Sequence, residues 1–301
     1  MTEGTKTRLH EPVSLPALHR QADAASNTKQ ASFIWVTRLR LGLLAFVATA
    51  GMVTCPLGGG GDAAGIAAAI AFFGVFVLEL YLWKVRPERM WHRARALAES
   101  AKTIAWRYAV HGAPFQEQEG ADELFLQRLK SLRDEAGPVA GPDDGSLDQI
   151  TSWMRTARRS DFDTRRQLYL HARVEDQITW YGARWRSVDR AATRWLVALI
   201  VLNVLGMAAA ILRATGATSV DALGLFGTLA AVGIAWTQTR QHESLAAAYA
   251  TAHDELTIIR ERIRQANAQH WPTEVNDAED AISREHTMWQ ASRAGSKPVV
   301  S

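Results

Sequence analysis

Residues 63–83 read AAGIAAAIAFFGVFVLELYLW and are almost entirely apolar. It carries one charged residue, Glu79. A helix of about 20 predominantly apolar residues spans the hydrocarbon core of a bilayer, which is roughly 30 Å thick. The stretch is therefore long enough and apolar enough to form a membrane span.

Three further windows have the same character and carry no charge: LGLLAFVATAGMVTCPL at 41–57, WLVALIVLNVLGMAAAIL at 195–212 and ALGLFGTLAAVGIAWTQT at 222–239. Buried helices of a soluble protein are the alternative, but four such windows in two close pairs favour a membrane protein. The loops at 58–61 and 213–221 are too short to hold soluble domains. We therefore predict an all-α integral membrane protein with two helical hairpins and four spans.

Basic residues predict the orientation of these hairpins. Lys and Arg number six in 1–40, nineteen in 84–190 and seven in 240–301, whereas the two hairpin loops hold only Arg213. An excess of Lys and Arg marks the cytoplasmic segments of membrane proteins, so both termini and the central region are expected in the cytoplasm. Tryptophan prefers the membrane interface. Four tryptophans lie at the expected cytoplasmic ends of the spans: Trp35, Trp83, Trp195 and Trp236.

Charge and cysteine content argue against several functional classes. The 34 basic and 31 acidic residues are interleaved and leave a net charge of only +3, so no nucleic-acid partner is expected. The single cysteine, Cys55, excludes an intrachain disulfide and a multi-cysteine metal site. Metal-ligand and nucleophile motifs are missing from the sequence, so we expect no enzyme and no cofactor. Paired acids such as Glu279 and Asp280 are interpreted as solvated helix faces.

The two halves of the chain resemble one another. Trp83 and Trp236 close their hairpins 153 residues apart, and Gly74 and Gly227 have the same separation. This repetition suggests a duplicated hairpin unit. We expect a flexible, cytosolic N-terminal tail at 1–30, a first unit at 31–136, a linker at 137–146, a second unit at 147–293 and a short tail at 294–301.

Helices on the cytosolic side are predicted to form a coiled-coil-like bundle. After the fourth span, apolar residues alternate spacings of four and three over about three heptads, which is typical of a coiled-coil seam. The seam consists of Leu245, Tyr249, Leu256, Ile259 and Ile263. Its partner is either a helix of the same chain or one of a neighbouring subunit.

A second cytosolic helix is predicted after the second span, where residues 98–115 read AESAKTIAWRYAVHGAPF. Gly112 and Pro114 are expected to end it, because glycine and a following proline commonly terminate helices. We interpret it as a docking helix that couples the first hairpin to the bundle. Its candidate docking residues are Lys102, Trp106, Arg107 and Tyr108.

Polar residues within the spans are candidate pore-lining positions, because intramembrane polar groups usually face a bundle interior or water. They are Glu79, Asn203 and Thr228. The alternatives are that Glu79 reaches the interface and that Asn203 makes an interhelical hydrogen bond. At the inner end of the first span, Arg38 and Arg40 are expected to contact anionic lipid, with a cytosolic anion vestibule or a nucleotide phosphate contact as the alternatives.

Small residues in the spans are expected at helix-packing faces, because they permit close approach of two backbones. These residues are Gly65, Ala69, Gly224, Gly227 and Gly233. Packing within one chain or between subunits would account for them equally well.

Three segments together resemble one bacterial family: residues 98–115, LYLHARVEDQITWYGARW at 168–185 and EDAISREHTMWQASR at 279–293. With the two hairpins, they are similar to the SLATT family of SMODS- and SLOG-associating two-transmembrane domains, here as two tandem units. The resemblance implies a membrane effector of bacterial conflict systems that forms pores when a nucleotide signal or sensor activates it. The sequence carries no recognisable nucleotide-synthesising or nucleotide-sensing domain, so a separate partner is expected to supply that trigger.

Two functions from different classes stay open. The first is an oligomeric pore in the bacterial inner membrane that depolarises the cell during anti-phage defence. Four thin helices cannot comfortably enclose a water path, so this function implies a homo-oligomer within the lipid bilayer. The second is a non-conducting membrane scaffold or receptor that recruits a cytosolic partner through its helices.

Overall fold

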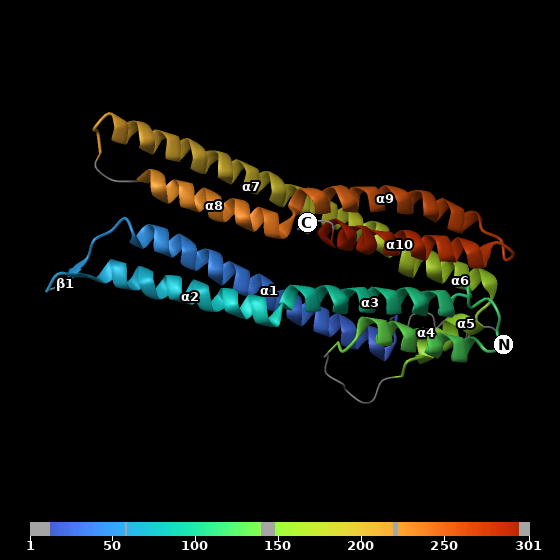
Figure 1. Ribbon diagram of the computed structural model, residues 1–301. Coiled ribbons are helices and arrows are strands. Elements are labelled where there is room, and N and C mark those ends of the chain that lie inside the picture. Colours follow the sequence, from blue (N-terminus) through green and yellow to red (C-terminus); the bar gives the residue numbers. More distant parts are fainter. Residues whose placement is uncertain (1–12, 58, 140–147, 219–221, 295–301) are drawn as a thin grey trace, which may run out of the picture. The chain divides into compact units, whose positions relative to one another are not determined.

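The computed structural model describes residues 13–57, 59–139, 148–218 and 222–294 (Figure 1). Helices account for 82% of the structure. Four helices are long and apolar enough to cross a membrane. The predicted all-helical membrane fold with four spans is therefore confirmed.

The first hairpin consists of α1 (Ala17–Ala50) and α2 (Ala63–Val85), which lie side by side in Figure 1. Gly74 marks a close approach of the two helices, because a Cβ built there would lie 3.3 Å from Leu43 Cδ1. Asp62 caps α2 by accepting hydrogen bonds from the first backbone N–H groups of the helix.

The turn of this hairpin contains a short β-ladder that the sequence analysis missed. β1 (Pro56–Leu57) pairs antiparallel with β2 (Gly61–Asp62). The predicted first span, 41–57, is wrong at its end, since α1 stops at Ala50. Pro56 explains part of the difference, because a proline disfavours helical backbone at the residue before it.

The predicted flexible tail at 1–30 is wrong for residues 17–30, which form the first turns of α1. Leu18 and Ala22 are buried there, and the side chain of Gln149 accepts a hydrogen bond from the Leu18 N–H at 3.1 Å. The segment is mostly polar, so its narrow buried face of mainly small residues was not recognised in the sequence. Parts of three expected segments, 1–12, 140–146 and 295–301, lie outside the described residues.

The helix that leads into the second hairpin begins well before the predicted third span. α6 (Phe162–Tyr169), the π-helical segment η2 (Leu170–Glu175) and α7 (Asp176–Ala214) follow one another without a break. α8 (Ala222–Arg240) then returns along α7. The predicted span at 195–212 therefore forms the second half of a much longer helix.

Contacts divide the chain into two compact units, each built from segments distant in sequence. The membrane unit comprises 30–87 and 185–247, and the bundle unit comprises 1–29, 88–184 and 248–301. Besides α6 and η2, the bundle unit holds most of α3 (Pro87–Ala109), α4 (Ala121–Ala136), α5 (Ser152–Arg159), most of α9 (His242–Gln265) and α10 (Trp271–Ala294).

Aromatic side chains fill the centre of the bundle unit. The Trp106 ring lies 5.0 Å from Trp153 and 5.9 Å from Tyr169, both in edge-to-face arrangements. Trp271 also packs edge-on against Tyr169, and its indole N–H donates to the Val110 carbonyl at 2.6 Å. Buried aromatics with a satisfied polar tip contribute large apolar area and fix the packing geometry.

Three residues of the predicted seam lie in this core: Leu256, Ile259 and Ile263. Tyr249 is partly buried, and its ring lies 5.5 Å from that of Trp180. Leu245 is half-buried and belongs to the membrane unit. The C-terminal part of the seam thus packs against helices of the same chain.

Candidate functional site

Glu79, the acid in the second span, is paired within its own hairpin. Its carboxylate accepts a hydrogen bond from Arg40 Nη1 at 2.7 Å, joining α2 to α1. Such a pair lowers the cost of a charged group near a membrane, since each charge is partly neutralised. The ion pair between Glu79 and Arg40 therefore links the two helices of the first hairpin.

Asn203 and Thr228, in the third and fourth spans, bond along their own helices. The Asn203 amide nitrogen donates to the Leu199 carbonyl at 2.8 Å, and the Thr228 hydroxyl donates to the Gly224 carbonyl at 2.9 Å. Asn203 is exposed on the single chain. Within the described chain, its amide therefore bonds along α7 and not to another helix.

The five small residues predicted at packing faces differ in their surroundings. Four are exposed on the single chain: Gly65, Ala69, Gly224 and Gly227. A Cβ built at Gly227 would meet nothing within 4 Å, whereas one at Gly233 would lie 2.8 Å from Leu199 Cδ2. Gly233 is thus the member of this set that lets α8 approach α7 closely.

The residues of the predicted docking helix lie in α3. Trp106 and Tyr108 are buried in the core of the bundle unit. Arg107 points toward α10, where it donates to the Asp280 carboxylate at 2.6 Å. Lys102 is half-buried, and burial together with the charge of Arg173 lowers its pKa.

The end of α3 differs in detail from the prediction. α3 ends at Ala109, and His111 adopts the left-handed conformation (φ 60°) that a glycine commonly adopts after a helix. Gly112 serves another purpose, since a Cβ there would lie 2.5 Å from Val275 Cγ1 on α10. The glycine therefore permits a close approach of two segments distant in sequence.

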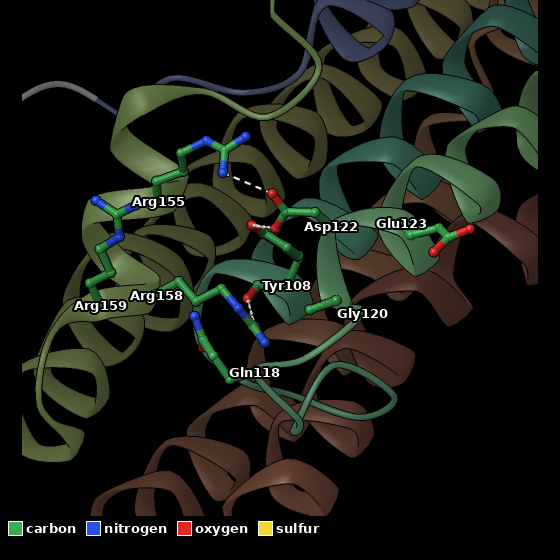
Figure 2. A pocket seen from close by; sticks show the side chains of 9 residues that line it. Tyr108, Gln118, Gly120, Asp122, Glu123, Arg155, Arg158 and Arg159 are labelled. Carbon is green, nitrogen blue, oxygen red and sulfur yellow. Dashed lines mark hydrogen bonds and ion pairs between the residues drawn. The ribbon is translucent and has the colours of Figure 1, made fainter.

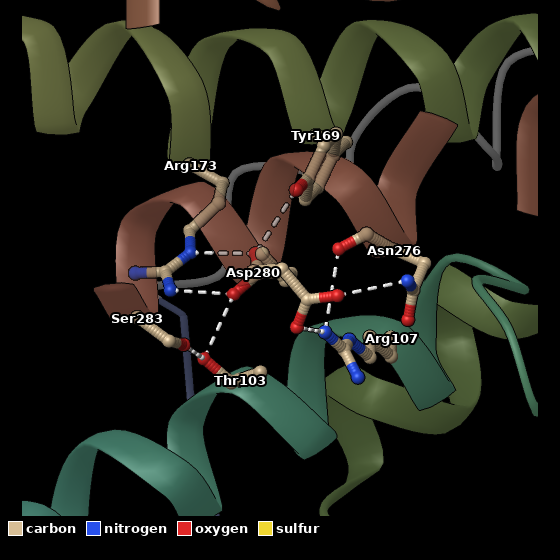
Figure 3. Close-up of polar contacts among 8 residues, drawn as sticks. Thr103, Arg107, Tyr169, Arg173, Asn276, Asp280 and Ser283 are labelled. Atoms are coloured by element: carbon tan, nitrogen blue, oxygen red, sulfur yellow. Dashed lines mark hydrogen bonds and ion pairs between the residues drawn. The ribbon is translucent and has the colours of Figure 1, made fainter. Parts of the chain in front are cut away.

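A buried polar network joins α3, α6, η2 and α10 of the bundle unit around Glu279 on α10 (Figure 3). Arg173 on η2 donates to both carboxylate oxygens of Glu279, through Nε at 2.9 Å and Nη2 at 2.7 Å. The hydroxyls of Tyr169 and Thr103 each donate to the same carboxylate at 3.0 Å. Arg173 and Glu279 have side-chain exposures of 1% and 0%, so the ion pair is fully buried.

The network alters the acid–base properties of its members. Burial and the charge of Glu279 raise the pKa of Tyr169 well above its usual value, which keeps the phenol protonated as a donor. Burial alone would lower the pKa of Arg173, but the charge and hydrogen bonds of Glu279 raise it. Tyr169 is thereby kept a neutral donor and Arg173 a charged donor, as their hydrogen bonds to Glu279 require.

A second cluster surrounds Arg158 on α5 (Figure 2). Its guanidinium donates to the carbonyls of Tyr108, Phe115 and Glu117, at 2.7, 3.0 and 2.5 Å. It also lies 4.8 Å from the centroid of the Tyr108 ring. This arginine holds the loop between α3 and α4 against α5.

Beside Arg158 lies a cavity of about 390 Å³ with mixed charge. Asp122, one of the two acids that line it, is engaged, because it accepts hydrogen bonds from the Tyr108 hydroxyl at 2.5 Å and from Arg155 at 2.8 Å. Burial and the bond to Asp122 raise the pKa of Tyr108 to about 12. Tyr108, Asp122 and Arg155 bond to one another and Arg158 bonds to backbone carbonyls, so we interpret the cluster as structural.

The burial of charged side chains was not predicted from the sequence. Glu279 was interpreted as part of a solvated face with Asp280, but its exposure is 0% and only Asp280 is largely exposed. A signal was present, since Glu279 shares the apolar face of α10 with Val275 and Ile282, at helical spacings of four and three. An acid inside an apolar stripe indicates a buried partner.

No metal centre is formed by the part of the chain that the structure describes. Groups of three or more His, Cys, Asp or Glu side chains that could hold an ion are absent from these residues.

Family models match the chain in two consecutive stretches. Residues 16–166 match SMODS and SLOG-associating 2TM effector domain 3, and residues 169–289 match SMODS and SLOG-associating 2TM effector domain 1. These limits differ from the units expected at 31–136 and 147–293. No curated protein and no solved structure gives a significant match. The chain therefore belongs to the SLATT family and carries two tandem SLATT domains.

Proposed function

We propose that this chain is an oligomeric, pore-forming effector of a bacterial conflict system that permeabilises the inner membrane. Its family is one of two-transmembrane effector domains, and the chain is a multi-pass membrane protein. In the proposal, both termini and the bundle unit lie in the cytoplasm. The basic residues described above support that orientation.

The position of Asn203 carries the proposal. The residue is polar, lies within a span and is exposed on the single chain. An exposed amide in hydrocarbon is costly, because lipid tails offer no hydrogen-bonding partner. Contact with a second copy of the chain or with a water path would remove that cost.

The low burial of the spans supports assembly of several chains. In each helix that contains a span, burial was compared over an apolar window of 18 residues. Only 6% of that window is buried in the helix of the third span, and at most 17% is buried in the other three. The spans of one chain therefore have little interior that could exclude lipid and hold water. A ring of several copies would provide one.

The bundle unit is the proposed receiver of the activating signal. A separate nucleotide-sensing or nucleotide-synthesising partner would act there, since α1, α7 and α9 each run from the bundle unit into the membrane unit. A movement of the bundle would be transmitted along continuous helices.

Replacing Asn203 tests this function. We expect Asn203→Leu to lower the membrane conductance of expressing cells by roughly three- to thirtyfold, because interhelical contacts of such residues contribute about 0.6–2 kcal/mol. Val201→Leu changes an exposed apolar residue two positions away and should leave conductance unchanged. A potential-sensitive dye in cells and current recordings in planar bilayers give the readout.

The same recordings can reject the pore. If the protein stays silent with its cognate partner bound, the non-conducting scaffold is the better description. Equal effects of Asn203→Leu and Val201→Leu would remove Asn203 as the critical position.

A further inference from the structure

The long helix that carries the third span contains one wide turn, η2. This turn is π-helical, whereas α6 before it and α7 after it are α-helical. A π-helical turn bonds to the fifth residue along the chain instead of the fourth, so it takes up one additional residue. Such turns are rare and occur frequently at functional sites. This one lies in the bundle unit, on the helix that continues into the membrane unit.

The wide turn keeps two buried side chains on the same face of the helix. Tyr169 precedes the turn and Tyr181 follows it, and their exposures are 0% and 1%. The two residues are 12 positions apart. In a regular α-helix that separation would place them about 120° apart, because each residue turns the helix by about 100°. Taking up one residue in the wide turn reduces the difference to about 20°, so both tyrosines reach the core.

Contacts in the bundle unit hold the helix on both sides of the wide turn. Tyr169, and Arg173 within the turn, both donate to the buried carboxylate of Glu279. On the other side, the ring of Tyr181 lies 5.9 Å from that of Tyr249 on α9. The aromatic contact is the easier of the two to release, because separating a buried ion pair costs more than separating one aromatic pair.

A second aromatic side chain is available for the place of Tyr181. If the wide turn became α-helical while Arg173 stayed bound, every residue after the turn would rotate by about 100°, which is one position along the helix. Trp180 would then take the place of Tyr181. Its ring already lies 5.5 Å from that of Tyr249, and the residue is 41% exposed. This second register would therefore bury a tryptophan against the same partner.

The second register has a cost as well as a gain. Ile178 packs against the core, and Gln177 would take its place, so an amide would replace an apolar side chain. The gain is the burial of the Trp180 ring and the replacement of a rare π-helical turn by an α-helical one. Because the two effects oppose one another, a modest signal can select between the registers.

We propose that η2 is a register switch of the helix that leads into the third span. In one state the wide turn is present and Tyr181 is in the core; in the other the turn is α-helical and Trp180 is in the core. The change turns α7 about its own axis by about 100° relative to α6. Asn203 lies further along α7, so its direction would change too. That consequence rests on the proposed pore, whereas the switch does not.

Fluorine NMR of the full chain in detergent follows Trp180 directly. Tryptophan is replaced biosynthetically by fluorotryptophan, and the resonance that disappears in Trp180→Phe is assigned to Trp180. The difference in its chemical shift between light and heavy water reports contact with solvent. We expect this difference in the unaltered chain, where Trp180 is partly exposed, and its loss in Tyr181→Ala, because the vacated place admits the tryptophan.

Deletion of Asp176 provides the matched control, because it removes the additional residue. Asp176 is exposed and directly follows the wide turn. The deletion brings Tyr169 and Tyr181 one position closer, so a regular α-helix keeps both on one face. We expect the deletion variant to unfold at a temperature close to that of the unaltered chain. Adding Tyr181→Ala to the deletion should leave Trp180 in contact with solvent.

Four outcomes would overturn the switch. If Trp180 keeps its solvent contact in Tyr181→Ala, the second register does not form; if this variant fails to fold, Trp180 does not replace the tyrosine. Equal burial of Trp180 with and without the deletion would indicate local collapse instead of a change of register. If deletion of Asp176 unfolds the bundle unit, the wide turn does not hold an additional residue. None of these measurements records current, so they are independent of whether the protein conducts.

Discussion

In the core of the bundle unit, charged side chains need partners because burying an unpaired charge is costly. Arg173 and Glu279 are tolerated in the core because their charges compensate one another through two hydrogen bonds and because two hydroxyls complete the carboxylate's hydrogen bonds. Removing one partner of such a pair leaves an uncompensated charge in a medium of low dielectric constant. Among the described residues, the buried Arg158 guanidinium has no carboxylate partner of this kind, and it donates its hydrogen bonds to backbone carbonyls.

We expect Glu279→Ala to lower the free energy of unfolding of the bundle unit by about 3–5 kcal/mol. Asp280→Ala is the matched control on the neighbouring residue. Its side chain is 57% exposed and pairs with Arg107, so its loss should cost about 1 kcal/mol or less. Thermal and denaturant unfolding of the detergent-solubilised chain, followed by tryptophan fluorescence, measures both; equal costs would contradict the assignment.

At the scale of elements, close helix contacts depend on where glycine lies on a helix. Composition predicted five small packing residues, but the described contacts distinguish them, since Gly233 lies against Leu199 and Gly227 faces open space. The sequence could not separate the two, because both are glycines of the same apolar helix. Which face of α8 meets α7 is decided by the pairing of the helices.

Leucine substitutions on α8 test this difference. We expect Gly233→Leu to destabilise the second hairpin by roughly 1–3 kcal/mol, because added volume at a tight contact displaces the neighbouring helix. Gly227→Leu should be neutral or stabilise α8 by up to about 1 kcal/mol, since glycine is a poor helix former. The midpoint of thermal unfolding in detergent compares the variants, and equal losses would argue against the asymmetric packing.

At the scale of the whole molecule, the two SLATT domains share one bundle core. Trp106 and Thr103 belong to the first matched range, whereas Tyr169, Trp271 and Glu279 belong to the second, and all five are joined in this core. The duplication inferred from hairpin spacing suggested two separate units. The contacts instead place parts of both domains in each compact unit.

A split chain tests this sharing. We expect fragments 1–143 and 144–301 to co-purify when they are expressed together, because each supplies residues that the other needs in its core. Either fragment alone should aggregate or unfold at a much lower temperature. Independent folding of both fragments, with no association between them, would contradict a common core.

The sequence by itself determined that this chain is a helical membrane protein with four spans and related it to the SLATT family. Those features depend on local composition, because a helix of about 20 consecutive apolar residues is most stable in the hydrocarbon core of a membrane. The tertiary structure was needed to show the burial of Glu279, the role of Gly112 and the helix formed by residues 17–30. Each of these depends on a partner far away in sequence, and a single window of residues does not contain that partner.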